Sequence, residues 1–169
     1  MAIQRVIAFF NNKLQEYVAR DVSAGVADAG QLVALASNGR LDTSMMPTGI
    51  GAPTVTLPAS EALAAGAYVN IYSNAGTPSV RNADGSTAAK QADGFVLAAV
   101  ASGATATVYL AGINTAVTGQ TVGLVYLGTA AGVGATVGAS TAGQTFQQIG
   151  IALGATSVQF EPQLPIVRA

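Results

Sequence analysis

The feature that most restricts what this chain can fold into is a long stretch without charge, because residues 94 to 160 contain no Asp, Glu, Lys or Arg. Over all 169 residues the charged fraction is 9 %, against about 25 % in a typical soluble domain. Half of the residues are hydrophobic, so we expect a packed core rather than disorder. A surface without charge either faces sister subunits or another protein, or stays hydrated through Thr, Ser, Gln and Asn. The sequence leaves both possibilities open.

The residue types that are missing restrict the function. The chain has no Cys and no His, which removes Cys/His and Ser/His/Asp catalysis and imidazole or thiolate zinc sites. The net charge of −1, with seven scattered basic residues, lacks the clustered basic stripe of a nucleic-acid-binding protein. We therefore expect a protein that is not an enzyme, with no catalytic residues, no metal, no cofactor, no small-molecule substrate and no nucleic-acid partner.

The N-terminal residues predict an amphipathic helix over residues 3–20. Apolar residues recur there at spacings of three and four, with charged and polar residues largely opposite. Such a stripe packs on the protein's own β-domain, docks on a partner or bundles with copies of the chain, and the sequence does not choose among these. The residues of the stripe are Ile3, Val6, Ile7, Phe10, Leu14, Tyr17 and Val18.

A hairpin signal and a methionine pair follow the predicted helix. Asn38-Gly39 lies between the apolar run of residues 32–35 and Arg40-Leu41-Asp42, which predicts a β-hairpin. Met45 and Met46 precede Pro47, so Met46 is expected to be extended. Residues 48–53 are rich in Gly and Pro and read as a linker. The adaptable methionine side chains suit a contact outside the domain, or a small core of the arm itself.

From residue 54 onward, short strand patterns recur about every ten residues with Gly and Asn at the breaks, which is typical of an antiparallel sandwich or barrel. The uncharged window of residues 94–113 is as long as a membrane span, but Ser102-Gly103 interrupts it and the following residues alternate with period two, so we expect two strands and no membrane span. The apolar run of residues 6–10 is too short for a secretory signal. The predicted strands are 54–57, 67–73, 78–81, 95–100, 105–110, 123–128, 145–153 and 156–160.

Three features invite a chemical role, and each has a plainer interpretation. The glycine-rich residues 128–140 do not match a phosphate-binding loop and read as a flexible or close-packed β-loop. Asp84 and Asp93 each precede a glycine, where turn chemistry is the ordinary role, although they could form a carboxylate pair. Strand tyrosines could line a sugar-binding face, but they are as often half-buried packing residues; they are Tyr68, Tyr72, Tyr109 and Tyr126.

Two segments carry a resemblance to a known family. ADGFVLAAVASGATATVYLAGINTAVTGQTVGLVYLGT (residues 92–129) and QQIGIALGATSVQFEPQLPI (residues 147–166) resemble the small β-module of tailed-bacteriophage capsid decoration (cement) and head-fibre proteins. GQLVALASNGRLDTSMMP (residues 30–47) looks like the joint that precedes such modules. The resemblance covers roughly residues 53–169, and the loop 128–143 is richer in Gly and Ala than the family pattern.

The resemblance implies a virion structural protein, trimeric, that sits on the outer capsid surface at threefold or quasi-threefold positions and binds the major capsid protein. We therefore expect a mainly β chain, in which residues 1–50 form a helical and hairpin arm for capsid anchoring or trimerisation and residues 51–169 form an antiparallel β-sandwich or barrel. A tail-fibre or tailspike module for host recognition is the alternative, and a polysaccharide-degrading enzyme using Asp84 and Asp93 is a third hypothesis. The candidate protein-binding residues are Ile3, Val6, Ile7, Phe10, Leu14, Tyr17, Met45 and Met46.

Overall fold

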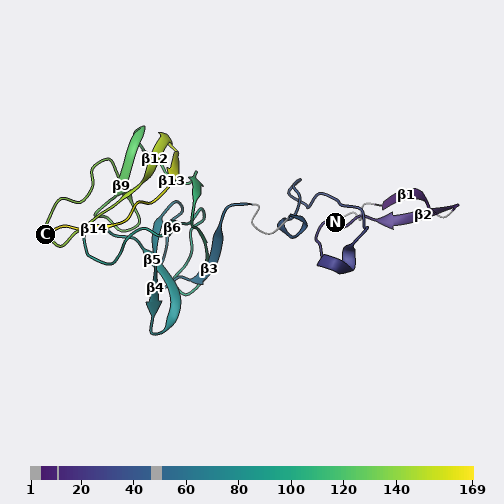
Figure 1. Ribbon diagram of the computed structural model, residues 1–169, viewed down its shortest axis with the longest axis horizontal. Coiled ribbons are helices and arrows are strands. Elements are labelled where there is room, and N and C mark those ends of the chain that lie inside the picture. The colour runs from purple at the N-terminus through teal and green to yellow at the C-terminus, as the bar shows by residue number, and fades with distance from the viewer. Residues whose placement is uncertain (1–4, 11, 47–50) are drawn as a thin grey trace. The chain divides into compact units, whose positions relative to one another are not determined.

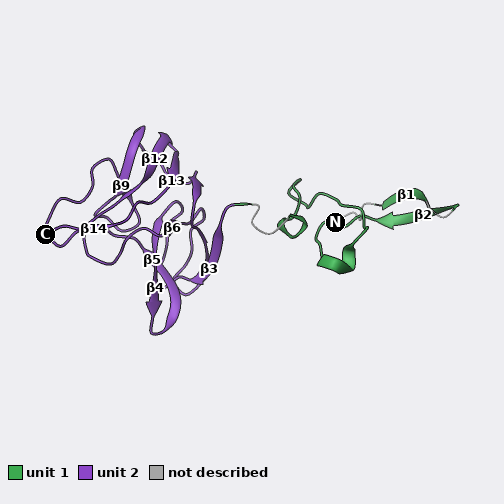
Figure 2. Cartoon of the chain, in the orientation of Figure 1, with its two compact units in different colours: residues 1–51 green, residues 52–169 purple. Residues whose placement is uncertain are grey.

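The computed structural model describes residues 5–10, 12–46 and 51–169. Its chain forms two compact units, residues Met1–Gly51 (unit 1) and Ala52–Ala169 (unit 2), which Figure 2 shows in different colours. The protein is mainly β, with 42 % of its residues in strands and 4 % in helices, and the strands pair in antiparallel sheets. This confirms the predicted mainly β class.

Unit 1 begins with a β-hairpin, so the predicted amphipathic helix over residues 3–20 is wrong. Strands β1 (Arg5–Phe10) and β2 (Lys13–Val18) pair along their whole length, and Asn12 in the connection has a left-handed φ of 62°. Asn tolerates this conformation in two-residue hairpin turns. The β-branched and aromatic residues of β1 favour a strand over a helix. The apolar spacing of three and four does not form a stripe here, since the register places Val6 and Tyr17 on one hairpin face and Ile7 and Leu14 on the other.

The rest of unit 1 consists of loops and two short 3-10 helices, η1 (Gly25–Asp28) and η2 (Thr43–Met45). The predicted Asn38-Gly39 turn is present, since the Gly39 N–H donates to the Ala36 carbonyl at 2.9 Å and the Ala36 N–H donates to the Arg40 carbonyl at 2.8 Å. However, residues 32–42 form no strand ladder, so the predicted hairpin there is reduced to a turn. Met46 is extended, as predicted, with φ −96° and ψ 147°. Pro47 to Ile50 lie outside the described residues.

Unit 2 contains two five-stranded antiparallel sheets and one short strand pair (Figure 1). The first sheet has the order β3-β7-β6-β4-β5, with β3 (Thr54–Pro58), β4 (Tyr68–Asn74), β5 (Thr77–Asn82), β6 (Gly94–Phe95) and β7 (Thr105–Tyr109). The second has the order β10-β9-β12-β13-β8, with β8 (Gly112–Asn114), β9 (Gly123–Leu127), β10 (Gly134–Ala135), β12 (Gln148–Gly154) and β13 (Ser157–Phe160). The pair is β11 (Thr145–Phe146) with β14 (Ile166–Val167).

Six of the eight predicted strands of unit 2 are confirmed with small shifts at their ends, as β3, β4, β5, β7, β9 and β13. The predicted strand 95–100 keeps only its first residue in a named strand, β6. The predicted strand 145–153 divides into β11 and β12 at Gln147, whose buried side chain donates to the carbonyls of Ala92 and Gln163 and accepts from the Ala92 N–H. Strands β8, β10 and β14 were not predicted.

The main core of unit 2 joins the two sheets in a sandwich-like arrangement. It takes Tyr68 and Phe95 from the first sheet and Phe160 from the second. The rings of Tyr68 and Phe160 stack with centroids 5.8 Å apart, and Phe95 meets Phe160 edge-on at 5.5 Å. Such aromatic contacts add to the free energy of apolar burial. Closure into a barrel is not seen among the described residues.

A second core lies on the other face of the first sheet. Val69, Val80 and Val108 of the sheet pack there against the loop segments 59–67 and 96–104. Leu63 and Val100 form a bridge between these two segments. The chain therefore leaves the sheet after Phe95 because its next residues, starting with buried Val96, cover this face. Around Tyr68, Val69 and Phe95 of β4 and β6, the first sheet is consequently buried on both sides.

Candidate protein-binding site

One face of the β1–β2 hairpin is apolar and open to solvent. Because paired residues of antiparallel strands share a face, the register places Ile7 opposite Glu16 and Phe9 opposite Leu14 on this face. The exposed fractions of Ile7 and Leu14 are 72 % and 74 %. On the same face, the guanidinium of Arg5 contacts the carboxylate of Glu16 at 3.1 Å, so an ion pair lies beside Ile7. This first hairpin face is defined by Ile7, Phe9, Leu14 and Val18.

The opposite hairpin face carries both apolar and polar side chains. Val6 pairs with Tyr17, and Ala8 pairs with Gln15. The Tyr17 hydroxyl donates to the side-chain oxygen of Gln15 at 3.0 Å. Tyr17 is half-buried, whereas Val6 is exposed.

The structure therefore separates the candidate residues that the sequence placed on one stripe. Val6 and Tyr17 lie on one hairpin face, and Ile7 and Leu14 lie on the other. Ile3 lies outside the described residues, and the side chain of Phe10, at the end of β1, is also outside them. Phe9 was missed as a site residue, although its period-two spacing from Ile7 was the signal that could have found it.

Met45 and Met46 belong to the loop region of unit 1. Met45 ends η2 and is half-buried beside a hollow of about 160 Å³, and Met46 is exposed. Asp42 caps η2 by accepting from the Ser44 N–H at 2.9 Å, and hydrogen bonding to the Ser44 side chain and backbone lowers the pKa of Asp42. The Ser44 hydroxyl also accepts from the Ser23 N–H at 2.9 Å. The methionines thus lie on a hydrogen-bonded loop framework separate from the β1–β2 strand pairing.

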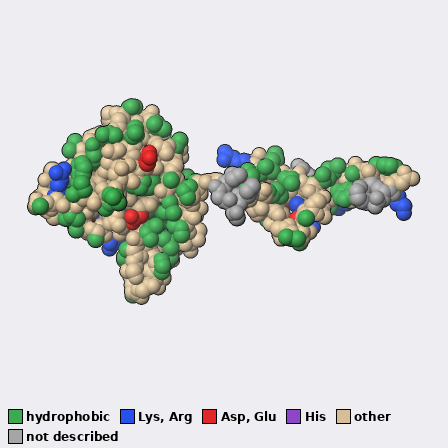
Figure 3. All heavy atoms as spheres, in the orientation of Figure 1, with side chains coloured by type: hydrophobic (Ala, Val, Ile, Leu, Met, Phe, Trp, Pro, Cys, Tyr) green, Lys and Arg blue, Asp and Glu red, His purple; other side chains and the backbone are tan. Residues whose placement is uncertain are grey.

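Unit 1 buries little of its apolar surface. Among its described residues, Ala34 alone is a buried hydrophobic residue. Large apolar side chains are exposed in the hairpin and in the loops, and Figure 3 shows such side chains on the face of the molecule that it draws. A two-stranded hairpin is marginally stable by itself. Unit 1 therefore leaves most of its large apolar side chains open to solvent.

The two carboxylates considered for acid/base chemistry take part in separate structural networks. Asp84 accepts from the Ser86 N–H at 2.8 Å, which is the predicted turn role. Asp93 differs from the turn prediction, because its carboxylate accepts from the Asn70 side-chain amide and from the Ile71 N–H, both at 2.9 Å. Within the part of the chain that the structure describes, there is no cluster of three or more potential metal ligands.

The glycine-rich loop is close-packed. Gly132 donates its N–H to the Ala83 carbonyl at 2.7 Å, and Gly128 donates to Val133 at 2.8 Å. A side chain at Gly134 would meet Val125 at 2.8 Å. Of the two plainer interpretations of this loop, close packing in a β-loop is therefore the one that the structure supports.

The tyrosines of unit 2 pack within the protein. Tyr68 is buried in the main core, Tyr109 stacks on Phe95 with centroids 5.3 Å apart, and the guanidinium of Arg81 lies 4.1 Å from the ring centroid of Tyr72. The ring of Tyr126 lies 5.2 Å from that of Phe146, so each of the four strand tyrosines contacts another side chain of the protein.

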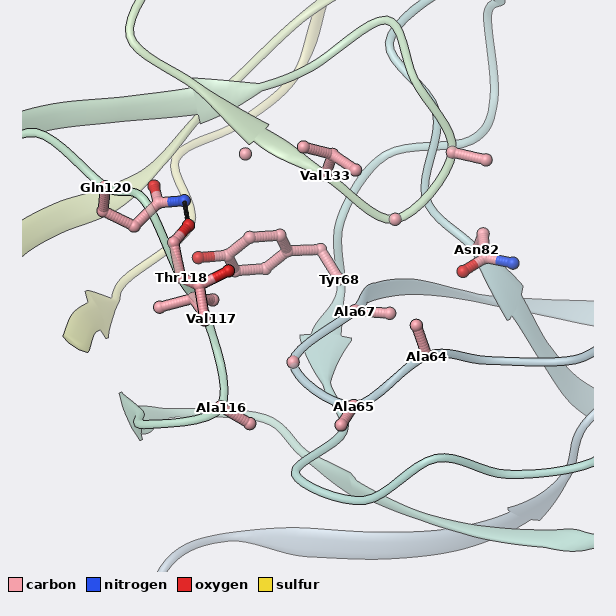
Figure 4. A pocket seen from close by; sticks show the side chains of 14 residues that line it. Ala64, Ala65, Ala67, Tyr68, Asn82, Ala116, Val117, Thr118, Gln120 and Val133 are labelled. Carbon is pink, nitrogen blue, oxygen red and sulfur yellow. Dashed lines mark hydrogen bonds between the residues drawn. The ribbon is translucent and has the colours of Figure 1, made fainter. Parts of the chain in front are cut away.

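Tyr68 also borders a small surface hollow of about 190 Å³ (Figure 4). Its hydroxyl is buried and has no hydrogen-bond partner among the described residues. Burial raises the pKa of Tyr68 to about 12. The polar side chains at the rim are those of Asn82, Thr118 and Gln120, and no charged side chain lines the hollow. Its volume is below the range of about 300–1,000 Å³ that is usual for small-molecule pockets.

None of the described helices has the length and apolar character needed to cross a membrane. Comparison with known proteins finds no protein family, no curated protein and no solved structure that matches this chain.

Proposed function

We propose that this chain is a non-enzymatic structural protein of a phage virion. It binds the outer surface of an icosahedral capsid through unit 1, as a trimer at threefold or quasi-threefold positions, and it stabilises the shell. Its partners are the major capsid protein and two further copies of itself, and it acts without a cofactor, a nucleic acid, a membrane or a small-molecule substrate.

The open hairpin face is the observation that carries the proposal. Ile7, Phe9 and Leu14 expose about two thirds or more of their side chains, and burying one such side chain is worth about 1.5–3 kcal/mol. Free edges of β1 and β2 among the described residues also present unpaired backbone groups, which a strand of another protein can pair with. An apolar face beside a free strand edge suits docking onto a protein shell.

Three further features support the same proposal. The resemblance of residues 92–129 and 147–166 to decoration and head-fibre proteins implies this class of function. The two separate carboxylate networks favour a structural role over the hypothesis of a polysaccharide-degrading enzyme. Joining three copies would make a weak docking contact effective, because the second and third contacts form at a high effective concentration.

The test is co-sedimentation of the full-length chain with capsids of the phage that encodes it, assembled without this chain. The double variant Ile7→Ala with Leu14→Ala keeps the strand positions and removes apolar surface, so we expect binding to fall by about tenfold or more. Leu164→Ala is the matched control, because Leu164 is 90 % exposed in unit 2, and it should bind like the unaltered chain.

Equal binding of the double variant and the control would refute the role of the hairpin. Absence of binding by the unaltered chain would refute capsid decoration. In that case, detection of the chain in the tail at the low copy number of a fibre would favour the alternative of a host-recognition module.

A further inference from the structure

The outer face of the second sheet carries a line of mostly apolar side chains that the core does not use, with Gln159 between two of them. Leu124 of β9 pairs with Ile151 of β12, Ile151 pairs with Gln159 of β13, and Gln159 pairs with Ile113 of β8. Directly paired residues share a face, so these four side chains form one line across four strands. Neighbouring strands are about 4.8 Å apart, which makes the line about 15 Å long.

The alternation of the strands fixes which side chains lie on this face. Val125, Ala152 and Val158 point into the main core and are buried. Their neighbours Leu124 and Ile151 are 47 % and 44 % exposed. The same face continues along β12 to exposed Leu153, two residues after Ile151. We call Ile113, Leu124, Ile151 and Leu153 the outer apolar row.

The outer apolar row lies entirely within the stretch of the sequence that has no charge. Its strands run from residue 112 to residue 160, and the first charged residue afterwards is Glu161. Interfaces between copies of one chain are more apolar than other protein interfaces and are depleted of charge at their centre. Covering this face therefore carries no cost of desolvating a charged side chain from these strands.

From this face and its missing charges, we infer that the outer apolar row is the centre of the contact between copies of this chain. Three rows meeting around a threefold axis would bury four large apolar side chains from each copy. The row covers less area than the roughly 800 Å² that each partner buries in a standard interface. Neutral polar side chains such as Gln159 therefore belong to the contact as well. The inference rests on the self-association in the proposed function and assigns it to unit 2.

The first test is the mass of the full-length chain by light scattering over a wide range of concentrations. We expect a trimer for the unaltered chain and a monomer for Ile151→Lys, because the new ammonium group would be buried among apolar side chains. Ile151 is exposed within one chain, so the variant should keep its circular dichroism spectrum and melting transition. Leu164→Lys places the same charge at an exposed position away from the row and should remain trimeric.

A second test measures access to the face directly. The chain has no cysteine, so Ile151→Cys and Leu164→Cys each introduce a single thiol. At trimer-forming concentrations, we expect a maleimide to label position 151 about tenfold or more slowly than in the dissociated chain. Position 164 should react at the same rate in both states.

A monomeric unaltered chain, an unchanged mass of Ile151→Lys, or equal labelling of position 151 in both states would overturn the inference. Capsid co-sedimentation separates this outcome from the proposed function. A trimer that depends on Ile151 but does not bind capsids would leave the contact in place and refute decoration. If the chain binds capsids and the Ile151→Lys variant is still a trimer, decoration stands and the assignment of the contact to the outer apolar row is refuted.

Discussion

The two units of this chain use similar residues to very different effect. Both contain antiparallel strands with Val, Ile, Leu and aromatic side chains. In unit 2 these side chains form two cores, whereas in the described part of unit 1 Ala34 alone is a buried hydrophobic residue. The difference is therefore one of architecture and not of apolar content.

The number of layers explains this difference. In unit 2, two five-stranded sheets cover each other on one side, and loop segments cover the first sheet on the other. In unit 1, one two-stranded hairpin has two faces and no second layer among the described residues. An apolar strand becomes a core element only where another layer covers it. The comparison predicts that side-chain truncation costs stability in unit 2 and binding in unit 1.

Truncation of Phe160 should give the largest effect and the sharpest contrast. Phe160 is buried and contacts the rings of Tyr68 and Phe95, so Phe160→Ala is expected to lower the free energy of unfolding by about 3–5 kcal/mol. Denaturant unfolding of the full-length chain measures this. Phe9→Ala, at a position 68 % exposed in unit 1, should leave the main transition in place. A comparable loss for both variants would mean that unit 1 has a core of its own.

Gly150 tests how tightly the strands of unit 2 approach each other. A side chain at this position in β12 would press against the backbone carbonyl of Gln159 in β13, so Gly150→Ala should destabilise unit 2 by about 1–3 kcal/mol. Gly154→Ala is the control in the same strand, because its Cβ would lie 3.5 Å from the Ser157 hydroxyl, an ordinary contact. Equal melting temperatures for the two variants would show that β12 and β13 can move apart at Gly150 without loss of stability.

Tyr68→Phe should produce a smaller change of opposite sign. The Tyr68 hydroxyl is buried without a partner among the described residues, so its removal should be neutral or should stabilise unit 2 by about 1 kcal/mol. With the pKa of Tyr68 raised to about 12, the neutral phenol favours the folded state. This contribution is complete below pH of about 10, the value for an unfolded tyrosine, and is lost as the pH rises to about 12.

Titration of the phenolate ultraviolet absorbance measures the second part of this prediction. The transition near pH 12 should disappear in Tyr68→Phe and persist in Tyr72→Phe. A marked loss of stability in Tyr68→Phe would show instead that the hydroxyl has a hydrogen-bond partner in the folded protein.

Glu16→Gln should have the smallest effect and tests the independence of the hairpin. The Arg5–Glu16 ion pair is about half exposed on both sides, and such pairs contribute about 0.2–1 kcal/mol. We expect hydrogen exchange of the β1 and β2 amides to accelerate by about twofold, with unit 2 unaffected. A change in exchange throughout unit 2 would show that the two units unfold together.

The strands of unit 2 were predictable where the pattern is local. In β7, buried Ala106 and Val108 alternate with exposed Thr105 and Thr107, and period two is visible in a single sequence. Residues 96–100 were assigned to a strand because they are apolar, but Val96 and Val100 cover the first sheet from outside it, and Leu97 packs against the main core. An apolar pattern in the sequence indicates that a residue is buried. It does not show whether that residue lies in a strand of the sheet or in a loop that covers the sheet.

The candidate site shows the same limit. Asn11-Asn12 between apolar runs was a turn signal, but the spacing of Val6, Phe10 and Leu14 also fits a helix. Pairing decides between the two, because the register of β1 and β2 places Ile7 and Leu14 on a different face from Val6 and Tyr17. The outer apolar row is likewise invisible in the sequence, since Ile113, Leu124 and Ile151 come to lie on one face only through the pairing of four strands.

By itself, the sequence determined the mainly β class, the turn at Asn38-Gly39, the extended Met46 and the absence of Cys, His and charge from residues 94 to 160. These are properties of single residues or of short segments. Tertiary structure alone decided that residues 5–18 form a hairpin, which of its side chains share a face, and which apolar strands remain uncovered. The physical reason is that strand pairing and layer packing join residues far apart in the chain, and only these contacts distinguish a core from a binding surface.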